Sequence, residues 1–301
     1  MGIITISRYR FGVVKMALFS KKQAQSSVLG GFVDGNLCYL ATDSLAFTPA
    51  QINSVDSWKA ALASLPKRGI GLRLALSSEL YEVISIDRPN VEENELSAAL
   101  TWAVKDLTNI PLEHQLIDYF ELKHQPSGAP KLQVVVTDKR RIQPMVLALD
   151  KLKITPELIT IEELALTNLL ANEPTPQMLL CQTQEQSLNL VVSMEGEFVF
   201  NRPISGIEFK EGQTELDRQM QFDSLILEMQ RSLDYLDRQL RLAPPTALSL
   251  LLPVDIQQWL APQIQTMFDL PVSSLTSLDR SVQHNLALAA SLESLEVRDE
   301  A

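Results

Sequence analysis

The chain has 301 residues, of which 46% are hydrophobic, and a formal net charge of -11 at pH 7. That length and apolar content supply enough material for a packed core, which we expect to be divided between two lobes. The acidic balance argues against a general affinity for nucleic acid or anionic lipid, because both attract clustered positive charge.

Cysteine and membrane signals are sparse. The two cysteines, Cys38 and Cys181, lie inside apolar strand-like runs, which is typical of reduced, buried thiols in a reducing compartment rather than of disulfide partners. No stretch reaches the roughly 20 apolar residues that span a bilayer, and residues 1–20 lack the layout of a secretory signal. We therefore expect a cytoplasmic protein that does not itself insert into the membrane.

The first residues raise a question about the start of the protein. The segment that begins at Met16 reads like a natural N-terminus, and a short polar stretch follows it through Ser27. We expect residues 1–27 to form a flexible tail, with residues 1–15 resulting from a mis-assigned start codon.

The middle of the first half alternates strand-like and helix-like patterns. Its predicted elements, in chain order, are strands at residues 72–76 and 81–86, a helix at 92–107, strands at 116–122 and 132–137, a helix at 140–152 and a strand at 154–161. The first helix is predicted from the spacing of Leu96, Leu100, Ala103, Val104 and Leu107. This order describes a small strand-helix-strand-strand-helix module set into a larger α/β domain.

Trp102 stands apart on the first of these helices. At about 100° per residue, its side chain projects roughly 140° away from the apolar stripe. Ala98 and Ala99 lie one turn before it and Asp106 one turn after it, so small residues leave the indole open beside one acid. An aromatic side chain in such a position can anchor a partner peptide, and these four residues are our candidate partner-binding site. The alternative is that Trp102 packs against the larger lobe.

Residues 215–242 predict a long helix whose apolar side chains alternate in steps of four and three. These side chains are Phe222, Ile226, Met229, Leu233, Leu236 and Leu240. Such a stripe is typical of a helix packed on its own sheet, and weak coiled-coil self-association is the alternative. Pro244-Pro245 ends the helix before a strand at residues 247–252. Trp58 and Trp259 lie on apolar faces of other segments and are expected in the core.

A set of short motifs follows in a characteristic order along most of residues 28–295. The motifs are Leu74-Ala75-Leu76-Ser77, Ile86-Asp87-Arg88-Pro89, Glu95, residues 103–106, Asn109-Ile110-Pro111-Leu112-Glu113, Asp118-Tyr119, and the helical segments at residues 227–235 and 285–292. In order and spacing they resemble the PilM-like proteins of type IV pilus assembly. The resemblance extends in particular to the branch that serves the mannose-sensitive haemagglutinin (MSHA) pilus, the MshI proteins.

The resemblance implies an α/β fold of the actin-like, or ribonuclease H-like, kind. Such a fold has two duplicated lobes, with a small subdomain inserted in the first. On this chain the first lobe would span residues 28–172, with the inserted subdomain at about residues 80–152. Residues 173–301 would form a reduced second lobe.

The resemblance also implies a function. Proteins of this family sit in the cytoplasm and bind the short N-terminal tail of a single-pass inner-membrane protein of the pilus assembly platform. We therefore expect a non-catalytic scaffold that a partner recruits to the inner membrane face. Two alternatives remain open, an active ATP-binding member of the same machinery and the actin-like cytoplasmic component of type II secretion. The family of the second alternative carries its own transmembrane helix.

The nucleotide turns of actin-like ATPases depend on glycines that let backbone N–H groups approach phosphate, and on aspartates that hold the metal. This chain departs from that pattern at three turns. In the first phosphate turn Phe32 replaces the aspartate, and Asp34-Gly35 reads as a hairpin turn instead. Residues 179–190, expected to hold the second phosphate turn, contain neither Asp nor Gly. Pro253-Val254-Asp255 stands where the adenosine-contacting glycines belong, so we expect no ATP–Mg or other cofactor.

No residue is predicted to be catalytic or to bind a metal. His114, His124 and His284 lack the spacing of a metal cluster or a nearby nucleophile signature. The paired acids Glu162 and Glu163 are expected in the first turn of a helix, where negative charge complements the helix dipole.

Overall fold

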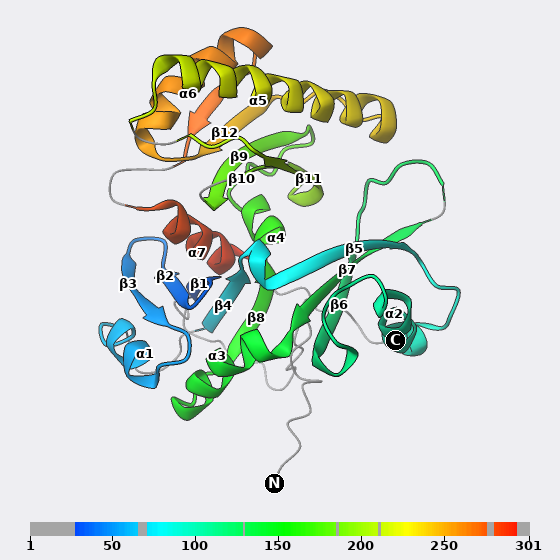
Figure 1. Cartoon of the computed structure of the whole chain (residues 1–301), viewed down its shortest axis with the longest axis vertical. Helices are drawn as coiled ribbons and strands as arrows, with labels where there is room; N and C mark the ends of the chain where they lie inside the picture. Colours follow the sequence, from blue (N-terminus) through cyan, green and yellow to red (C-terminus); the bar gives the residue numbers. More distant parts are fainter. Residues whose placement is uncertain are drawn as a thin grey trace. The chain divides into compact units, whose positions relative to one another are not determined.

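A computed structural model describes residues 28–65, 71–128, 130–184, 187–209, 212–275 and 280–293 of the chain (Figure 1). The expectations for residues 1–27 lie outside the described residues. The chain divides into two compact units. Unit 1 is drawn from Met1–Glu121, Ala129–Ala165 and Leu286–Ala301, and unit 2 from Leu122–Gly128 and Leu166–Asn285.

Unit 1 is built on a five-stranded mixed sheet. Its strands, in chain order, are β1 (Val28–Asp34), β2 (Leu37–Ala41), β3 (Ala46–Gln51), β4 (Gly71–Leu76) and β8 (Pro156–Ile161). In space they are ordered β3-β2-β1-β4-β8. The first three strands form an antiparallel meander, and β4 and β8 continue the sheet in parallel with β1.

Unit 2 repeats this topology. Its strands are β9 (Gln177–Gln184), β10 (Ser187–Met194), β11 (Glu197–Ser205), β12 (Ala247–Leu251) and β13 (Val272–Ser274). They are ordered β11-β10-β9-β12-β13, again with an antiparallel meander followed by two parallel strands. Helices α3 (Lys139–Lys151) and α6 (Val254–Phe268) precede the equivalent parallel strands β8 and β13. The predicted duplication is therefore present in the strand order itself.

The inserted module lies between β4 and α3. It consists of β5 (Tyr81–Asp87), α2 (Glu93–Val104), β6 (Gln115–Glu121) and β7 (Lys131–Asp138), with the strands ordered β5-β7-β6. Alternate residues of β7 point toward α2, as the two-residue period of a strand requires. They form a small core of their own, made of Leu96, Leu100, Val104, Leu132, Val134 and Val136.

One boundary of the predicted module is wrong. The second predicted helix, α3, buries Ile142, Met145 and Leu149 in the core of the unit 1 sheet, together with α1 (Val55–Ala61). Because α3 is the crossover between the parallel strands β4 and β8, its apolar face covers that sheet rather than the module. The insertion is therefore a strand-helix-strand-strand unit.

Helix α7 (Val282–Leu292) covers the opposite face of the unit 1 sheet. Leu29 and Val33 of β1 point into the core with α1 and α3, so Gly30 faces the other side. A side chain at Gly30 would overlap the backbone of Ala287 in α7. Arg73 of β4 reaches the same helix, where its Nη1 donates to the carbonyl oxygen of Ser291 at 3.0 Å.

The compact units do not follow the expected division at residues 172 and 173. The main segment of unit 2 begins at Leu166, and the last helix from Leu286 onward belongs to unit 1. The predicted second lobe, residues 173–301, contained all of that helix. The reason is the close fit of α7 on β1, which joins residues separated by more than 250 positions.

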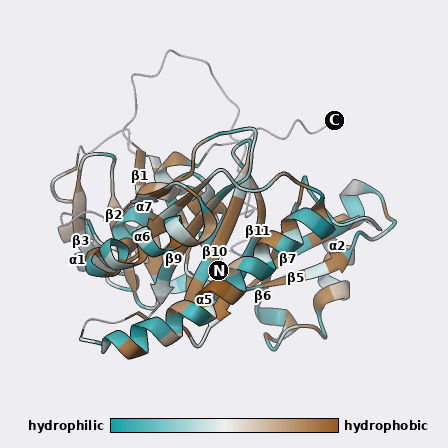
Figure 2. Ribbon diagram, turned by 90° about the horizontal axis from the view of Figure 1, so that it is seen from above, coloured by the Kyte–Doolittle hydropathy of each residue, from teal (hydrophilic) through white to brown (hydrophobic). Residues whose placement is uncertain are grey.

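Helix α5 (Glu215–Tyr235) packs on its own unit. Phe222, Ile226 and Met229 are buried in the unit 2 core, and Leu236 joins them from the π-helical turn that follows, Leu236–Leu240. The packing interpretation of this stripe is therefore correct, and the stripe is not open for self-association. In Figure 2 the strands of β9 and β10 are largely apolar, whereas α5 alternates between apolar and polar residues.

The remaining sequence predictions concern single side chains. Cys38 and Cys181 are both buried and free, as expected. Trp58 is fully buried, whereas Trp259 is partly buried against Phe222, with ring centroids 6.0 Å apart. None of the described helices is long and apolar enough to cross a bilayer.

Candidate functional site

The first expected phosphate turn is a tight hairpin. β1 ends at Asp34, and Gly35 turns the chain with φ +55° into β2. No atom lies within 4 Å of the position that a Cβ of Gly35 would take, so this glycine serves the turn and not a close approach of other atoms. Phe32 is completely buried. The position expected to carry a metal-holding aspartate therefore carries a core side chain.

The charge around this hairpin is unfavourable for phosphate. Partial burial, followed by the repulsion of nearby Glu79, raises the pKa of Asp34 from its ordinary value of 3.8. Two neighbouring carboxyl groups also disfavour the binding of an anionic ligand, because like charges repel.

The two other expected nucleotide turns lie in unit 2. Residues 185 and 186, between β9 and β10, lie outside the described residues. The two antiparallel strands carry buried Leu179, Leu180 and Leu190. At the third turn β12 leads through Leu252 to Pro253, the residue that caps the N-terminus of α6. Proline has no backbone N–H group, so this helix start offers one donor fewer than a glycine turn would.

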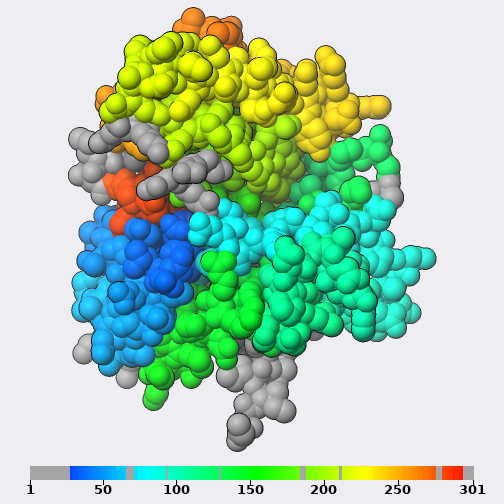
Figure 3. Space-filling model, viewed as in Figure 1, coloured from blue at the N-terminus to red at the C-terminus, as the bar shows by residue number. Residues whose placement is uncertain are grey.

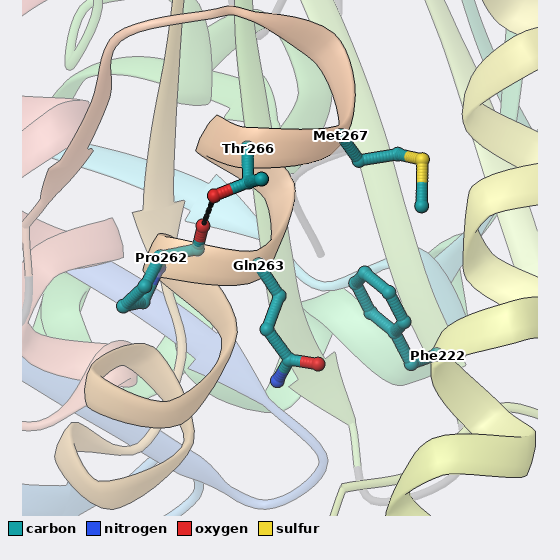
Figure 4. Close-up of a pocket in the computed structure, with 5 residues that line it drawn as sticks. All are labelled: Phe222, Pro262, Gln263, Thr266 and Met267. Atoms are coloured by element: carbon teal, nitrogen blue, oxygen red, sulfur yellow. Dashed lines mark hydrogen bonds between the residues drawn. The ribbon is translucent and has the colours of Figure 1, made fainter.

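A shallow groove in unit 2 lies between α5 and α6 and has a volume of about 490 Å³ (Figure 4). It is lined by Phe222, Pro262, Gln263, Thr266 and Met267. Thr266 donates to the carbonyl oxygen of Pro262 at 2.8 Å, and Gln263 donates to that of Trp259 at 3.0 Å. None of the five residues is ionisable, so the groove offers apolar contact rather than acid-base chemistry.

Within the residues that the structure describes, no three or more His, Cys, Asp and Glu side chains are grouped so that they could hold a metal ion. His114 lies at the end of a short 3-10 helix before β6, and His284 contacts Ser281 Oγ through Nδ1 at 2.8 Å at the start of α7. The histidines therefore lie in separate elements.

Trp102 lies on the open side of α2. Its side chain is 64% exposed, so the alternative that it packs against the larger lobe is not what the structure shows. Lys105 Nζ lies 5.0 Å from the indole centroid, within the range of a cation–π contact, and 3.9 Å from Asp106. Ala98 is exposed and Ala99 partly exposed beside it. We refer to Ala98, Ala99, Trp102 and Asp106 as the α2 surface.

Two members of the predicted buried stripe are exposed instead. Ala103 is exposed, and Leu107 is 57% exposed. α2 ends at Val104, so Leu107 lies beyond the helix and the helical spacing no longer governs its direction. The helix contacts its sheet along the narrow line of Leu96, Leu100 and Val104. Ala103 and Leu107 therefore add exposed apolar side chains near the end of α2 that the sequence pattern did not predict.

A buried acidic pair that the sequence pattern did not predict lies at the start of α4 (Glu162–Thr167). Glu162 and Glu163 lie in the first turn, as predicted, but they are almost fully buried. Glu162 accepts a hydrogen bond from the backbone N–H of Ser78 at 3.1 Å, and Glu163 accepts one from the hydroxyl of Tyr81. The pair therefore ties the start of the inserted module to α4. The helical pattern alone gave no sign of this burial.

We predict that Glu163→Gln raises the thermal midpoint at neutral pH. Burial, opposed by the hydrogen bond from Tyr81, raises the pKa of Glu163 above its ordinary value of 4.5. The native state therefore holds the proton more tightly than the unfolded state, and stability falls as pH rises from 4.5 through the raised pKa. Glutamine carries no ionisable proton and still offers Tyr81 an acceptor, so its advantage should appear above that window and shrink below pH 4.5.

Thermal unfolding of both proteins at acidic and neutral pH measures this effect. Glu95→Gln on the exposed side of α2 is the matched control and should leave the midpoint unchanged at both pH values. A Glu163→Gln variant that is less stable than wild type at neutral pH would contradict the assignment.

No protein-family model matches the chain, and no curated protein sequence matches it. Solved structures do resemble it. A chain of the PilM–PilN type IV pilus biogenesis complex aligns with a TM-score of 0.60 and 16% identity, over 89% of this chain and 98% of that chain. The chain has the actin-like ATPase fold.

Two further structures are similar at lower TM-scores. The cytoplasmic domain of EpsL, an inner-membrane component of the type II secretion system of Vibrio cholerae, aligns at 0.49 and 12% identity, over 89% of this chain and 96% of its own. A Bacteroides thetaiotaomicron protein with an actin-like ATPase fold aligns at 0.48 and 10% identity, over 90% and 99%. At 16% identity, the likeness to the chain of the PilM–PilN complex shows the fold alone, and function has to be argued from the residues.

Proposed function

We propose that this chain is a non-catalytic, cytoplasmic scaffold of a type IV pilus assembly platform of the MSHA type, as its resemblance to the MshI proteins implies. In this proposal the α2 surface binds the cytoplasmic N-terminal tail of a single-pass inner-membrane protein. The partner recruits the scaffold to the inner membrane face, and the chain itself hydrolyses no nucleotide.

The observation that carries the proposal is the exposed indole of Trp102 on the inserted module. The indole is 64% exposed, so little of its area is buried in the free protein. A partner that covers it can therefore bury most of that area. Ala98 leaves room beside the ring, and Asp106 offers a negative charge to a basic tail. Likeness to a chain from a two-protein pilus complex supports a docking role on the same fold.

The form of the nucleotide turns supports the non-catalytic part. Phe32 is buried where the metal-holding aspartate is expected, and Pro253 caps the helix where glycines are expected. The fold supports one alternative, an active ATPase of the same machinery. It would require a site built from side chains rather than from glycine turns.

Trp102→Ala should weaken tail binding by about tenfold or more, which is the range of an interface hot spot. Fluorescence anisotropy with labelled candidate tail peptides measures the dissociation constant. Because the indole is exposed, the free energy of unfolding of the variant should stay within about 0.5 kcal/mol of wild type, as is typical of surface substitutions.

Val83→Ala is the matched control, since Val83 is 41% exposed on β5 of the same module and lies outside the α2 surface. This variant should bind like wild type. Unchanged binding by Trp102→Ala would remove the α2 surface from the proposal, and a sharp fall in its thermal midpoint would assign the indole to packing.

A further inference from the structure

Helix α5 carries a second row of apolar side chains that its own unit leaves uncovered. Leu216, Met220 and Leu227 are 70%, 62% and 48% exposed. At about 100° per residue they point within roughly 40° of one another and about 140° away from buried Phe222. The helix is thus apolar on two sides, one in the core and one in solvent. Its residues form much of the yellow band at the surface in Figure 3.

The spacing of this row is that of a helix-packing seam. Leu216, Met220 and Leu227 follow one another in steps of four and seven, and Asp223 occupies the seam position between the last two. A single exposed apolar residue needs no explanation on a protein surface, but three aligned along about three turns of one helix form an apolar strip that only Asp223 interrupts. Met220 adds an adaptable side chain of the kind enriched at binding surfaces.

The acidic side chains along α5 differ in their partners. In the C-terminal half Glu228 pairs with Arg231, and Asp234 pairs with Arg238 at 3.6 Å. In the apolar half Asp223 accepts a hydrogen bond from the neutral amide of Gln219 at 3.1 Å and is exposed. Its negative charge is therefore presented to solvent in the middle of the strip.

We propose that the outer face of α5, formed by Leu216, Met220, Asp223 and Leu227, is the docking surface for an amphipathic helix of a partner protein that places a Lys or Arg opposite Asp223. Apolar residues of the partner at the same steps of four and seven would cover the strip. The basic residue would convert the exposed carboxylate into an ion pair and set the register of the two helices.

A second copy of this chain fits the surface less well. Two copies of α5 in parallel register would bring Asp223 against Asp223. An antiparallel pair about the centre of the strip would set each Asp223 against Met220, with no basic side chain in the strip to pair with it. Each chain also carries a net charge of -11, which adds to the repulsion. A basic partner removes both penalties. The surface lies in unit 2 and is independent of the α2 surface, which lies in unit 1.

The test uses the whole protein and a synthetic helical peptide of two heptads, with leucines in the seam and lysines at its flanks. A matched peptide carries glutamates in place of the lysines. Fluorescence anisotropy should show that wild type binds the lysine peptide at least about tenfold more tightly than the glutamate peptide. Asp223→Lys should reverse that preference, and Met220→Glu should weaken the lysine peptide about tenfold.

Asp234→Lys is the matched control, because it makes the same charge change on the same helix beyond the apolar strip and should keep the wild-type preference. Equal binding of both peptides by wild type, or an unchanged preference in Asp223→Lys, would overturn the proposal. Sedimentation velocity supplies the other check. A wild-type dimer that Met220→Glu dissociates would assign the face to a second copy and overturn the proposed partner.

Discussion

Gly30→Ala should destabilise unit 1 by about 3 kcal/mol or more and release α7 from the sheet. The added Cβ would overlap the backbone carbonyl of Ala287 and lie 2.8 Å from the backbone nitrogen of Ser291. Overpacking of a core usually costs about 1–3 kcal/mol because side chains can shift. Here the obstacle is helix backbone, so the whole of α7 must move. Thermal unfolding, together with hydrogen exchange of the α7 amides, measures both effects.

Gly31→Ala is the matched control on the neighbouring position. Its Cβ would meet the side chains of Leu74, Cys38 and Leu40, which can adjust, and it lies on the face away from α7. We expect a smaller loss of stability and no change in exchange at α7. A Gly30→Ala protein with wild-type stability would show that α7 does not pack on β1 as described.

Trp58→Ala should cost about 3–5 kcal/mol, the range for removing a large aromatic side chain from a core. Trp58 is fully buried in α1, among the residues that pack α1 and α3 against the sheet. Its indole Nε1 also donates to the carbonyl oxygen of Ile52 at 3.2 Å, which fixes the start of the helix relative to β3. The substitution therefore removes packing and leaves a buried carbonyl without its donor.

The free energy of unfolding from denaturant titration checks this value. Lys59→Ala changes the adjacent, exposed residue of α1 and should stay within about 0.5 kcal/mol of wild type. If Trp58→Ala were as stable as the Lys59 control, the core of unit 1 would have to be organised differently.

Local patterns predicted the elements well. The hairpin at Asp34-Gly35, the strands of the inserted module and the packing stripe of α5 all follow from turn chemistry and from the periods of strand and helix. The exposure of Trp102 was also predicted, because the angle of about 100° per residue places its side chain away from the apolar stripe of one helix.

The errors concern contacts between distant segments. The close fit of α7 on Gly30 joins the two ends of the chain, and Glu163 meets Tyr81 across 82 positions. Neither contact can be predicted from the spacing of residues that are close in the sequence. The exposure of Leu107 depended on where α2 ends, and helix ends are the least certain part of a sequence pattern.

Titration calorimetry with ATP and magnesium tests most directly whether this actin-like fold serves docking rather than nucleotide chemistry. With Phe32 buried at the first turn and Pro253 at the third, we predict no heat of binding at micromolar to millimolar nucleotide, while a nucleotide-binding protein of the same fold gives a normal isotherm. A micromolar dissociation constant, followed by a crystal structure with an ordered triphosphate and magnesium ion, would contradict the proposal.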